Sequence, residues 1–264
     1  MMNMNHTNKF AGFAATLAAL AVFSLHAATI PVSWDFGDDA GKDNLNDFTI
    51  SGTGTTSLQA DAARLTISSH PDFENLMAQT QIADLGNGQN RNFTINMTFS
   101  SVENVLSENF ERIGLLAFSD SASSDNTGIA ALLHRGGSST SFQLRLREGL
   151  VGGTDVQQDW TGAVSAGTIF DATLKATYSG PDVIVDFTLR DSNNHSQTLS
   201  ETFAAASRDG QFFGFGMRGN GGGSGQNMIA DFDSFAVIPE PGTLVLLGLS
   251  GFALAFSGLR KRRQ

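Results

Sequence analysis

The chain has 264 residues, no cysteine and a formal net charge of −10 at pH 7. The lack of cysteine excludes disulfides, thiol nucleophiles and thiolate metal sites. Residues 28–238 hold 25 Asp and Glu against 11 Lys and Arg, a net charge of −14. This balance argues against a nucleic-acid partner, because nucleic acids are bound by clustered Lys and Arg.

The first 27 residues have the pattern of a secretory signal peptide. Lys9 is the only charged side chain before Asp35, and residues 10–25 form an apolar run rich in Ala and Leu. The small residues Ala27 and Ala28 follow, and we expect signal peptidase to cleave after Ala27. The alternative is an N-terminal anchor that is retained.

Residues 28–238 are expected to form one all-β domain. Phe93, Ile95, Met97 and Phe99 alternate with Thr and Asn, and the same period of two recurs at residues 142–147 and 183–189. Such alternation is typical of strands with one buried and one solvated face. Residues 113–118 and 129–133 are more uniformly apolar and are predicted to be central strands.

The order of these elements resembles the concanavalin A-like jelly roll, the β-sandwich of laminin-G domains, lectins and some glucanases. The resemblance is carried by residues 170–189 and by the closing segment 230–237, which we expect to pair with residues 32–36. It implies a two-sheet fold that is shared by lectins, glycosidases and adhesion modules, so it does not by itself imply an activity.

No catalytic motif stands out in the domain. The Glu-x-Asp-x-x-Glu strand of glucanases on this fold is absent, and Glu108 and Glu111 are the nearest acidic cluster. His70, His134 and His195 lack metal-binding spacing, so we expect them at the surface or in turns. Residues 214–219 match a dinucleotide fingerprint by letter, but the glycine-rich residues 220–225 cannot form the helix it requires. The prediction is a protein without catalytic activity.

Two features could bind ligands. Asp35, Asp38 and Asp39 lie in or near the opening strand, and Asp231 and Asp233 lie on the closing one. If the strands pair, Asp35, Asp231 and Asp233 would converge and could bind Ca²⁺, although a solvated strand face explains them as well. Trp160 could stack on a sugar ring, or it could instead anchor the core.

The C-terminal 26 residues, 239–264, form a separate signal. Pro239-Glu240-Pro241 precedes a charge-free apolar run, residues 243–259, and the basic residues Arg260, Lys261, Arg262 and Arg263. A helix of that length approaches the thickness of a bilayer core, and the basic cluster would stop transfer on the cytoplasmic side. The alternative is an ordinary anchor helix.

These three parts together resemble the PEP-CTERM sorting signal of Gram-negative bacteria. The resemblance implies export through the cytoplasmic membrane, transient anchoring by the C-terminal helix, and processing near the tripeptide by an exosortase, a membrane-embedded cysteine transpeptidase-like enzyme. The protein would then reside in the cell envelope or outside the cell.

The function favoured by the sequence is a non-catalytic surface or matrix protein, associated with biofilm exopolysaccharide or with adhesion. A lectin-like carbohydrate-binding module, with or without calcium, is the alternative. A glycan-active enzyme is the third reading.

Overall fold

The computed structural model describes residues 32–68, 73–82, 85, 91–103, 106, 109–136, 141–151, 155–204, 210–220 and 227–240. These residues contain strands and no α-helix, and none of their segments is a helix long and apolar enough to cross a membrane. The chain divides into two units, Pro31–Ile238 and the two ends of the chain, Met1–Ile30 with Pro239–Gln264. The predicted cleavage site after Ala27 and the predicted membrane helix lie outside the described residues.

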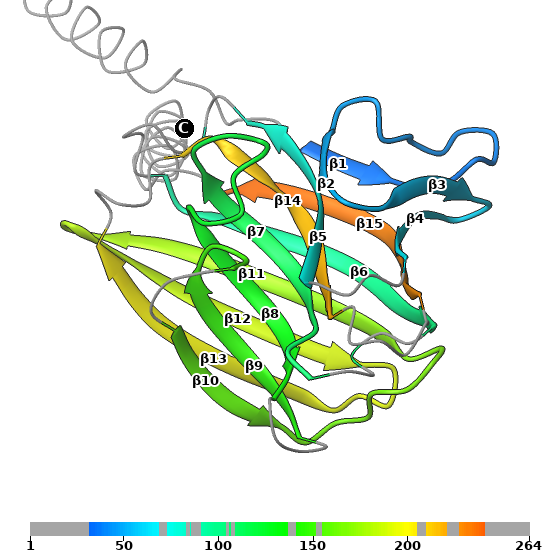
Figure 1. The fold of residues 1–264 in the computed structure, drawn as a ribbon. Helices are drawn as coiled ribbons and strands as arrows, with labels where there is room; N and C mark the ends of the chain where they lie inside the picture. Colours follow the sequence, from blue (N-terminus) through cyan, green and yellow to red (C-terminus); the bar gives the residue numbers. More distant parts are fainter. Residues whose placement is uncertain are drawn as a thin grey trace, which may run out of the picture. The chain divides into compact units, whose positions relative to one another are not determined.

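Two antiparallel sheets form the body (Figure 1). The eight-stranded sheet has the order β13 (Ser196–Ala204), β12 (Asp182–Asp191), β11 (Ile169–Ser179), β6 (Phe93–Glu103), β15 (Met228–Pro239), β4 (Ala62–Ile67) and β3 (Thr55–Gln59), and β1 (Val32–Asp35) also pairs with β15. The seven-stranded sheet has the order β10 (Asp155–Trp160), β9 (Phe142–Glu148), β8 (Ile129–Arg135), β7 (Arg112–Ser119), β14 (Phe212–Asn220), β5 (Phe73–Gln81) and β2 (Thr49–Gly52). The prediction of an all-β jelly roll is confirmed.

The closing strand pairs with the opening strand as the sequence predicts. Trp34 lies opposite Phe235 in the pairing of β1 with β15, whereas the first half of β15 pairs with β4. Between these halves the alternation of buried residues shifts, because Phe232 and Phe235 are both buried and are three residues apart. A shift of this kind is a bulge, and it places Asp233 at the junction of β1 and β4.

Aromatic side chains from both sheets fill the core. The rings of Phe215 on β14 and Phe232 on β15 stack with centroids 4.4 Å apart, joining the two sheets. Phe215 also contacts Phe36, Phe48 and Phe235, with centroids 5.6–5.7 Å apart. The residues predicted to be central strands form β7 and β8, which lie inside the seven-stranded sheet. Since the chain has no disulfide, burial of these rings and of the aliphatic core residues is the main stabilising term.

A turn held by side-chain hydrogen bonds connects β12 to β13 in the eight-stranded sheet. The carboxylate of Asp191, at the end of β12, accepts hydrogen bonds from the backbone N–H groups of Asn193 and His195 at 2.9 and 3.0 Å. Asn194 adopts a left-handed conformation with φ of 66°, which Asn tolerates better than most residues. The turn at residues 191–195 therefore sets the register of β12 with β13.

Candidate functional site

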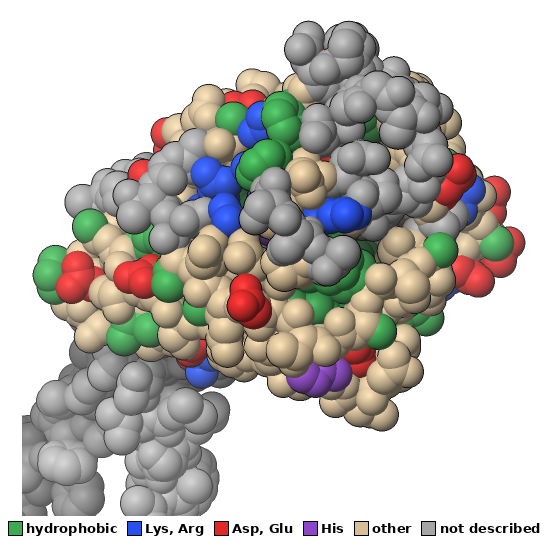
Figure 2. All heavy atoms as spheres, turned by 60° about the horizontal axis from the view of Figure 1, so that its bottom comes forward, with side chains coloured by type: hydrophobic (Ala, Val, Ile, Leu, Met, Phe, Trp, Pro, Cys, Tyr) green, Lys and Arg blue, Asp and Glu red, His purple; other side chains and the backbone are tan. Residues whose placement is uncertain are grey.

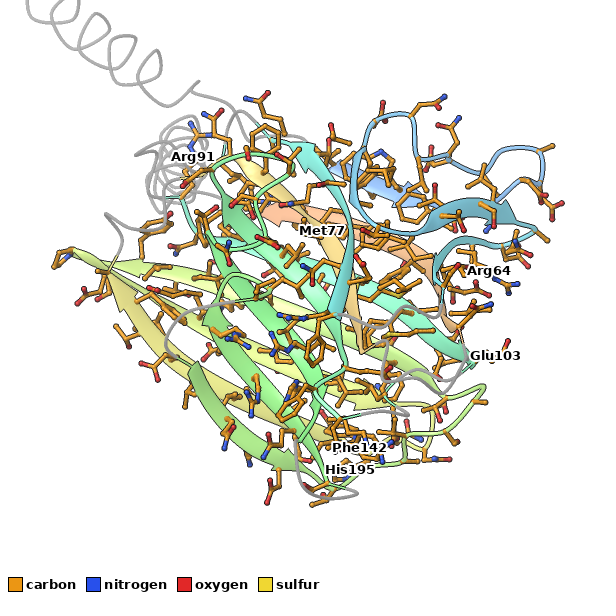
Figure 3. The ribbon with its side chains drawn as sticks, in the orientation of Figure 1. Arg64, Met77, Arg91, Glu103, Phe142 and His195 are labelled. Carbon is orange, nitrogen blue, oxygen red and sulfur yellow. The ribbon has the colours of Figure 1, made fainter. Side chains whose placement is uncertain are left out.

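The predicted calcium ligand Asp231 is bound to an arginine. Its two carboxylate oxygens accept hydrogen bonds from Nε and Nη2 of Arg64 on β4, at 2.7 and 2.8 Å. Arg64 is labelled in Figure 3. The two residues lie opposite each other in the pairing of β4 with β15, so the bidentate geometry follows from the strand register.

The second predicted ligand, Asp35, is bound to a lysine. Both of its carboxylate oxygens accept hydrogen bonds from Nζ of Lys42, at 2.9 and 3.0 Å. The hydrogen bond with Asp35 is the main cause of the raised pKa of Lys42. Lys42 also lies 3.7 Å from a carboxylate oxygen of Asp61.

The third predicted ligand, Asp233, lies among these charges. Burial, and then the negative charge of Asp231, raise the pKa of its carboxyl from 3.8 to about 6. The structure therefore brings the three carboxylates to one region, as predicted. Two of the three are bound to cationic side chains, however, and the described residues contain no group of three or more acidic, His or Cys side chains that could hold a metal. This arrangement does not fit a preformed calcium site.

Trp160 is a core residue in the structure. Its side chain is 5% exposed and packs edge-on against His195 and Phe170, with centroids 4.8 and 6.5 Å away. Little of the ring is left for a sugar to stack on, so the structure favours the alternative role, a core anchor. Around it, Thr161, His195 and Gln197 form a hydrogen-bonded group with contacts of 2.9–3.4 Å, which ties the end of β10 to β13.

The residues considered for catalysis do not form a catalytic pair among the described residues. Glu111 is 3% exposed, while Glu108 and His70 lie outside the described residues. His195 lies in the β12–β13 connection, as expected. The expectation that His134 lies at the surface or in a turn is wrong, because it is in β8 and is fully buried.

The surroundings of His134 form a site that the sequence analysis missed. Four arginines point outward from the seven-stranded sheet, since each alternates with residues of the main core. We call this set the arginine face: Arg112 on β7, Arg145 and Arg147 on β9, and Arg218 on β14. Figure 2 shows Lys and Arg side chains grouped beside hydrophobic ones on the surface turned to the viewer.

Strand register lines up the polar residues of this face. One row runs straight across six strands, from β10 to β5, and consists of Asp159, Gln143, His134, Arg112, Arg218 and Asn75. In the next row Arg145 of β9 lies opposite Leu132, and Met77, labelled in Figure 3, lies opposite Gly216. The residues of each row are one inter-strand spacing apart, about 4.8 Å.

The electrostatic effect of the arginine face is visible at His134. Burial is the largest cause that lowers the pKa of His134 to about 3, and the positive charges of all four arginines add to it. His134 is therefore neutral near pH 7, and neither ring nitrogen has a hydrogen-bond partner. A buried polar ring without partners in a positive field is unfavourable for folding alone.

Part of the outer face is covered by the connection after β9, which contains Leu150 and Val151. Met77, Leu116, Ala130 and Leu132 form a second apolar cluster with Leu150 and Val151. Arg112 Nη1 donates to the carbonyl of Leu150, and Arg147 Nη2 donates to that of Val151. These two arginines therefore hold the connection after β9, whereas Arg145 and Arg218 stay partly exposed.

The first two residues of the Pro-Glu-Pro tripeptide lie at the end of the closing strand. Pro239 is the last residue of β15, and Glu240 follows it. Pro241 and the basic residues Arg260–Arg263 lie outside the described residues. Residues 237–263 match the family model "PEP-CTERM protein-sorting motif". The motif implies export and recognition by an exosortase.

Solved structures of legume lectins share the fold of the body. The Lotus tetragonolobus seed lectin is 14% identical at a TM-score of 0.55, over 80% of this chain and 98% of that chain. The metal-free form of lectin I-B4 from Griffonia simplicifolia is 10% identical at a TM-score of 0.55, over 80% of this chain and 100% of that chain. Lectin I from Ulex europaeus, in complex with the methyl glycoside of α-L-fucose, is 13% identical at a TM-score of 0.53, over 79% of this chain and 96% of that chain.

At these identities the likeness concerns the fold alone, and no curated protein sequence matches the chain. The chain therefore carries a PEP-CTERM sorting motif at its C-terminal end and, before it, the concanavalin A-like jelly roll of the legume lectins.

Proposed function

We propose that the protein is exported, processed by an exosortase, and then acts without catalysis at the surface or in the extracellular matrix of a Gram-negative bacterium. Its role there is association with biofilm exopolysaccharide or adhesion. The observation that carries the proposal is the match of residues 237–263 to the PEP-CTERM motif. The signal-peptide pattern of residues 1–27 supports it, because export requires a signal at the other end of the chain.

The local chemistry of the tripeptide fits recognition as an extended segment. Pro239 and Pro241 have fixed φ angles and no N–H group, so the peptide between them cannot join a helix. The β conformation of the chain up to Pro239 is consistent with this. The carboxylate of Glu240 has no role in hydrophobic insertion, and its function is to be read by the processing enzyme.

The proposal is tested by separating processing from anchoring. Glu240→Ala should leave export and membrane association intact and block maturation, so the unprocessed form should accumulate on a blot from a host that has the exosortase. Glu240→Gln, which keeps the size of the side chain, shows whether the charge is read. If the Glu240→Ala protein matures at the parental rate, the tail is an ordinary anchor and the proposal fails.

The basic cluster is expected to act differently. Replacing Arg260, Lys261, Arg262 and Arg263 by Ser removes the charges that are costly to move into hydrocarbon. This variant should lose its fixed orientation in the membrane, which protease accessibility from the outside would detect. Retention of the parental orientation would argue against the stop-transfer role.

The second candidate function is carbohydrate binding by the sandwich. The observation that favours it is the fold shared with lectins, among them one solved in complex with a fucose glycoside. Calorimetric titration of the exported protein with polysaccharides distinguishes this function from adhesion that does not involve sugars. Release of reducing ends or unsaturated products from the same polysaccharides would instead reveal an enzyme.

A further inference from the structure

Positive charge is concentrated on one sheet of an acidic body. Of the 11 Lys and Arg in residues 28–238, five arginines lie on β7, β8, β9 and β14 of the seven-stranded sheet. Four of them form the arginine face. The body has a net charge of −14, so chance placement does not favour such a cluster. Among the acidic residues around it, Asp159 ends the row, Asp155 lies opposite Arg147 in the pairing of β10 with β9, and Asp125 accepts a hydrogen bond from Asn75.

The fold places like charges directly opposite one another. Arg218 lies opposite Arg112 in the pairing of β14 with β7, and on its other side Arg112 lies opposite His134, which is neutral near pH 7 and so does not offset either charge. Directly opposed like charges destabilise a sheet. A bound anion would remove the repulsion between the two arginines. Arrangements that lower the stability of a protein are commonly kept because they serve its function.

The face also contains polar atoms without partners. Both ring nitrogens of the fully buried His134, Nε of Arg218 and Oδ1 of Asn75 are buried and make no hydrogen bond. The three residues belong to one row of the outer face. Unpaired buried polar atoms are rare in native proteins, and strain, a functional role, or a bound water or ion accounts for them.

Two exposed aromatic rings border the row. Phe73 and Phe110 are 39% and 43% exposed, and their centroids are 6.3 Å apart. Cζ of Arg218 lies 4.5 Å from the centroid of Phe73, and the ring of Phe110 lies 6.3 Å from that of His134. Phe110 has a φ of 69°, which is a strained conformation for a bulky residue and is commonly found at functional sites.

We propose that the arginine face, bordered by Phe73 and Phe110, binds the carboxylate groups of an acidic polysaccharide. Guanidinium groups bind carboxylates with two parallel hydrogen bonds, which favours a uronate over a neutral sugar. The exposed rings supply apolar surface for the sugar. The middle of the row is buried, but the two partly exposed arginines, Arg145 on β9 and Arg218 on β14, are three inter-strand spacings apart, about 14 Å, which suits an extended chain rather than a single sugar. The inference rests on the proposed carbohydrate-binding function and names its ligand class.

The arginines have two different roles in this proposal. Arg145 and Arg218 are partly exposed and contact the carboxylates. Arg112 and Arg147 are 8% and 6% exposed and bind the carbonyls of Leu150 and Val151, so they contribute positive potential and position the connection after β9. Arg145 Nη2 donates to Oε1 of Gln143 at 2.9 Å, which holds its side chain along the strand before a ligand arrives.

The test uses calorimetric titration of the exported, purified protein with polygalacturonate, dextran sulfate, polyglutamate and neutral dextran. We expect binding to polygalacturonate that weakens as salt is added, and no binding to dextran. Arg218→Gln and Arg145→Gln should each weaken binding about 10- to 100-fold, as for loss of a charged hydrogen bond. Phe110→Ala should weaken it without changing the salt dependence.

Arg190→Gln is the matched control, because Arg190 is exposed on β12 of the other sheet and the substitution changes the net charge equally. An equal loss of affinity in Arg190→Gln would show a non-specific charge effect and overturn the proposal. Equal or tighter binding of dextran sulfate or polyglutamate would overturn the assignment to a uronate. If a neutral glycan binds and Arg218→Gln and Arg145→Gln leave that binding unchanged, carbohydrate binding stands and the arginine face is not its site. Urea unfolding of each variant separates lost affinity from lost folding.

Discussion

Asp233 gives the sharpest prediction about stability. Its carboxyl is partly buried at the bulge of β15, with the carboxylates of Asp231, Asp61 and Asp35 and the ammonium of Lys42 acting on it. Asp233→Asn keeps the shape and removes the charge. We therefore expect the substitution to stabilise the protein at neutral pH and to have no effect in acid.

The magnitude follows from the pKa shift. The pKa of Asp233 rises from 3.8 to about 6 in the folded state, mainly through burial. The folded protein therefore binds more protons than the unfolded chain in this window, and its stability falls as the pH rises from about 4 to about 6. A shift of about 2 units corresponds to at most about 3 kcal/mol. Solvent screening of a partly buried group reduces this to about 1–2 kcal/mol, or about 2–8 °C in Tm.

The assay is urea unfolding of the parent and Asp233→Asn from about pH 4 to about pH 8. His134 has the opposite effect, because its lowered pKa makes stability fall as the pH drops from 6.5 toward about 3. Only the difference between parent and variant therefore isolates Asp233. Asp171→Asn, which removes an exposed carboxylate from β11 of the same sheet, is the control. A difference that stays constant across the pH range would refute the reasoning.

Three further outcomes are expected. As the pH falls from about 6 to about 4, the free energy of unfolding of His134→Gln should decrease less than that of the parent, because the substitution removes a buried ring that resists protonation. Parallel plots of unfolding free energy against pH for the two proteins would contradict this. Gly162→Ala should destabilise the protein by about 1–3 kcal/mol, because a Cβ would lie 2.4 Å from Cζ2 of Trp160 and 2.7 Å from Oδ2 of Asp191. Thermal melting measures the loss, and an unchanged Tm would show that the site relaxes around the added methyl group. Because Asp35 and Asp231 are bound to Lys42 and Arg64, we expect the Tm to be indifferent to millimolar Ca²⁺ and to chelator, and a Tm that rises with added Ca²⁺ would contradict this.

The sequence alone was sufficient for the fold class and for the sorting signal. Strands can be predicted from local sequence, because the alternation of apolar and polar residues in segments such as 93–99 and 183–189 shows which side chains are buried, whichever strand each segment pairs with. The pairing of residues 32–35 with β15 was predicted from the order of elements and is confirmed. The tail was recognised because its three parts lie next to one another in the chain.

The candidate sites depended on the tertiary structure, because they are made by register between strands that are distant in sequence. Alternation shows that Arg145 and Arg147 point away from the core, but nothing local shows that β14 lies between β5 and β7 and brings Arg218 opposite Arg112. Local alternation likewise indicates that Asp231 lies on the face opposite Phe232, but its partner Arg64 is set by the register of β15 with β4, which the sequence does not show. His134 directly follows the apolar residues 129–133, which were predicted to be a central strand, and this was the local signal that could have indicated its burial. Its burial, and the positive field that keeps it neutral, exist only once four strands have paired.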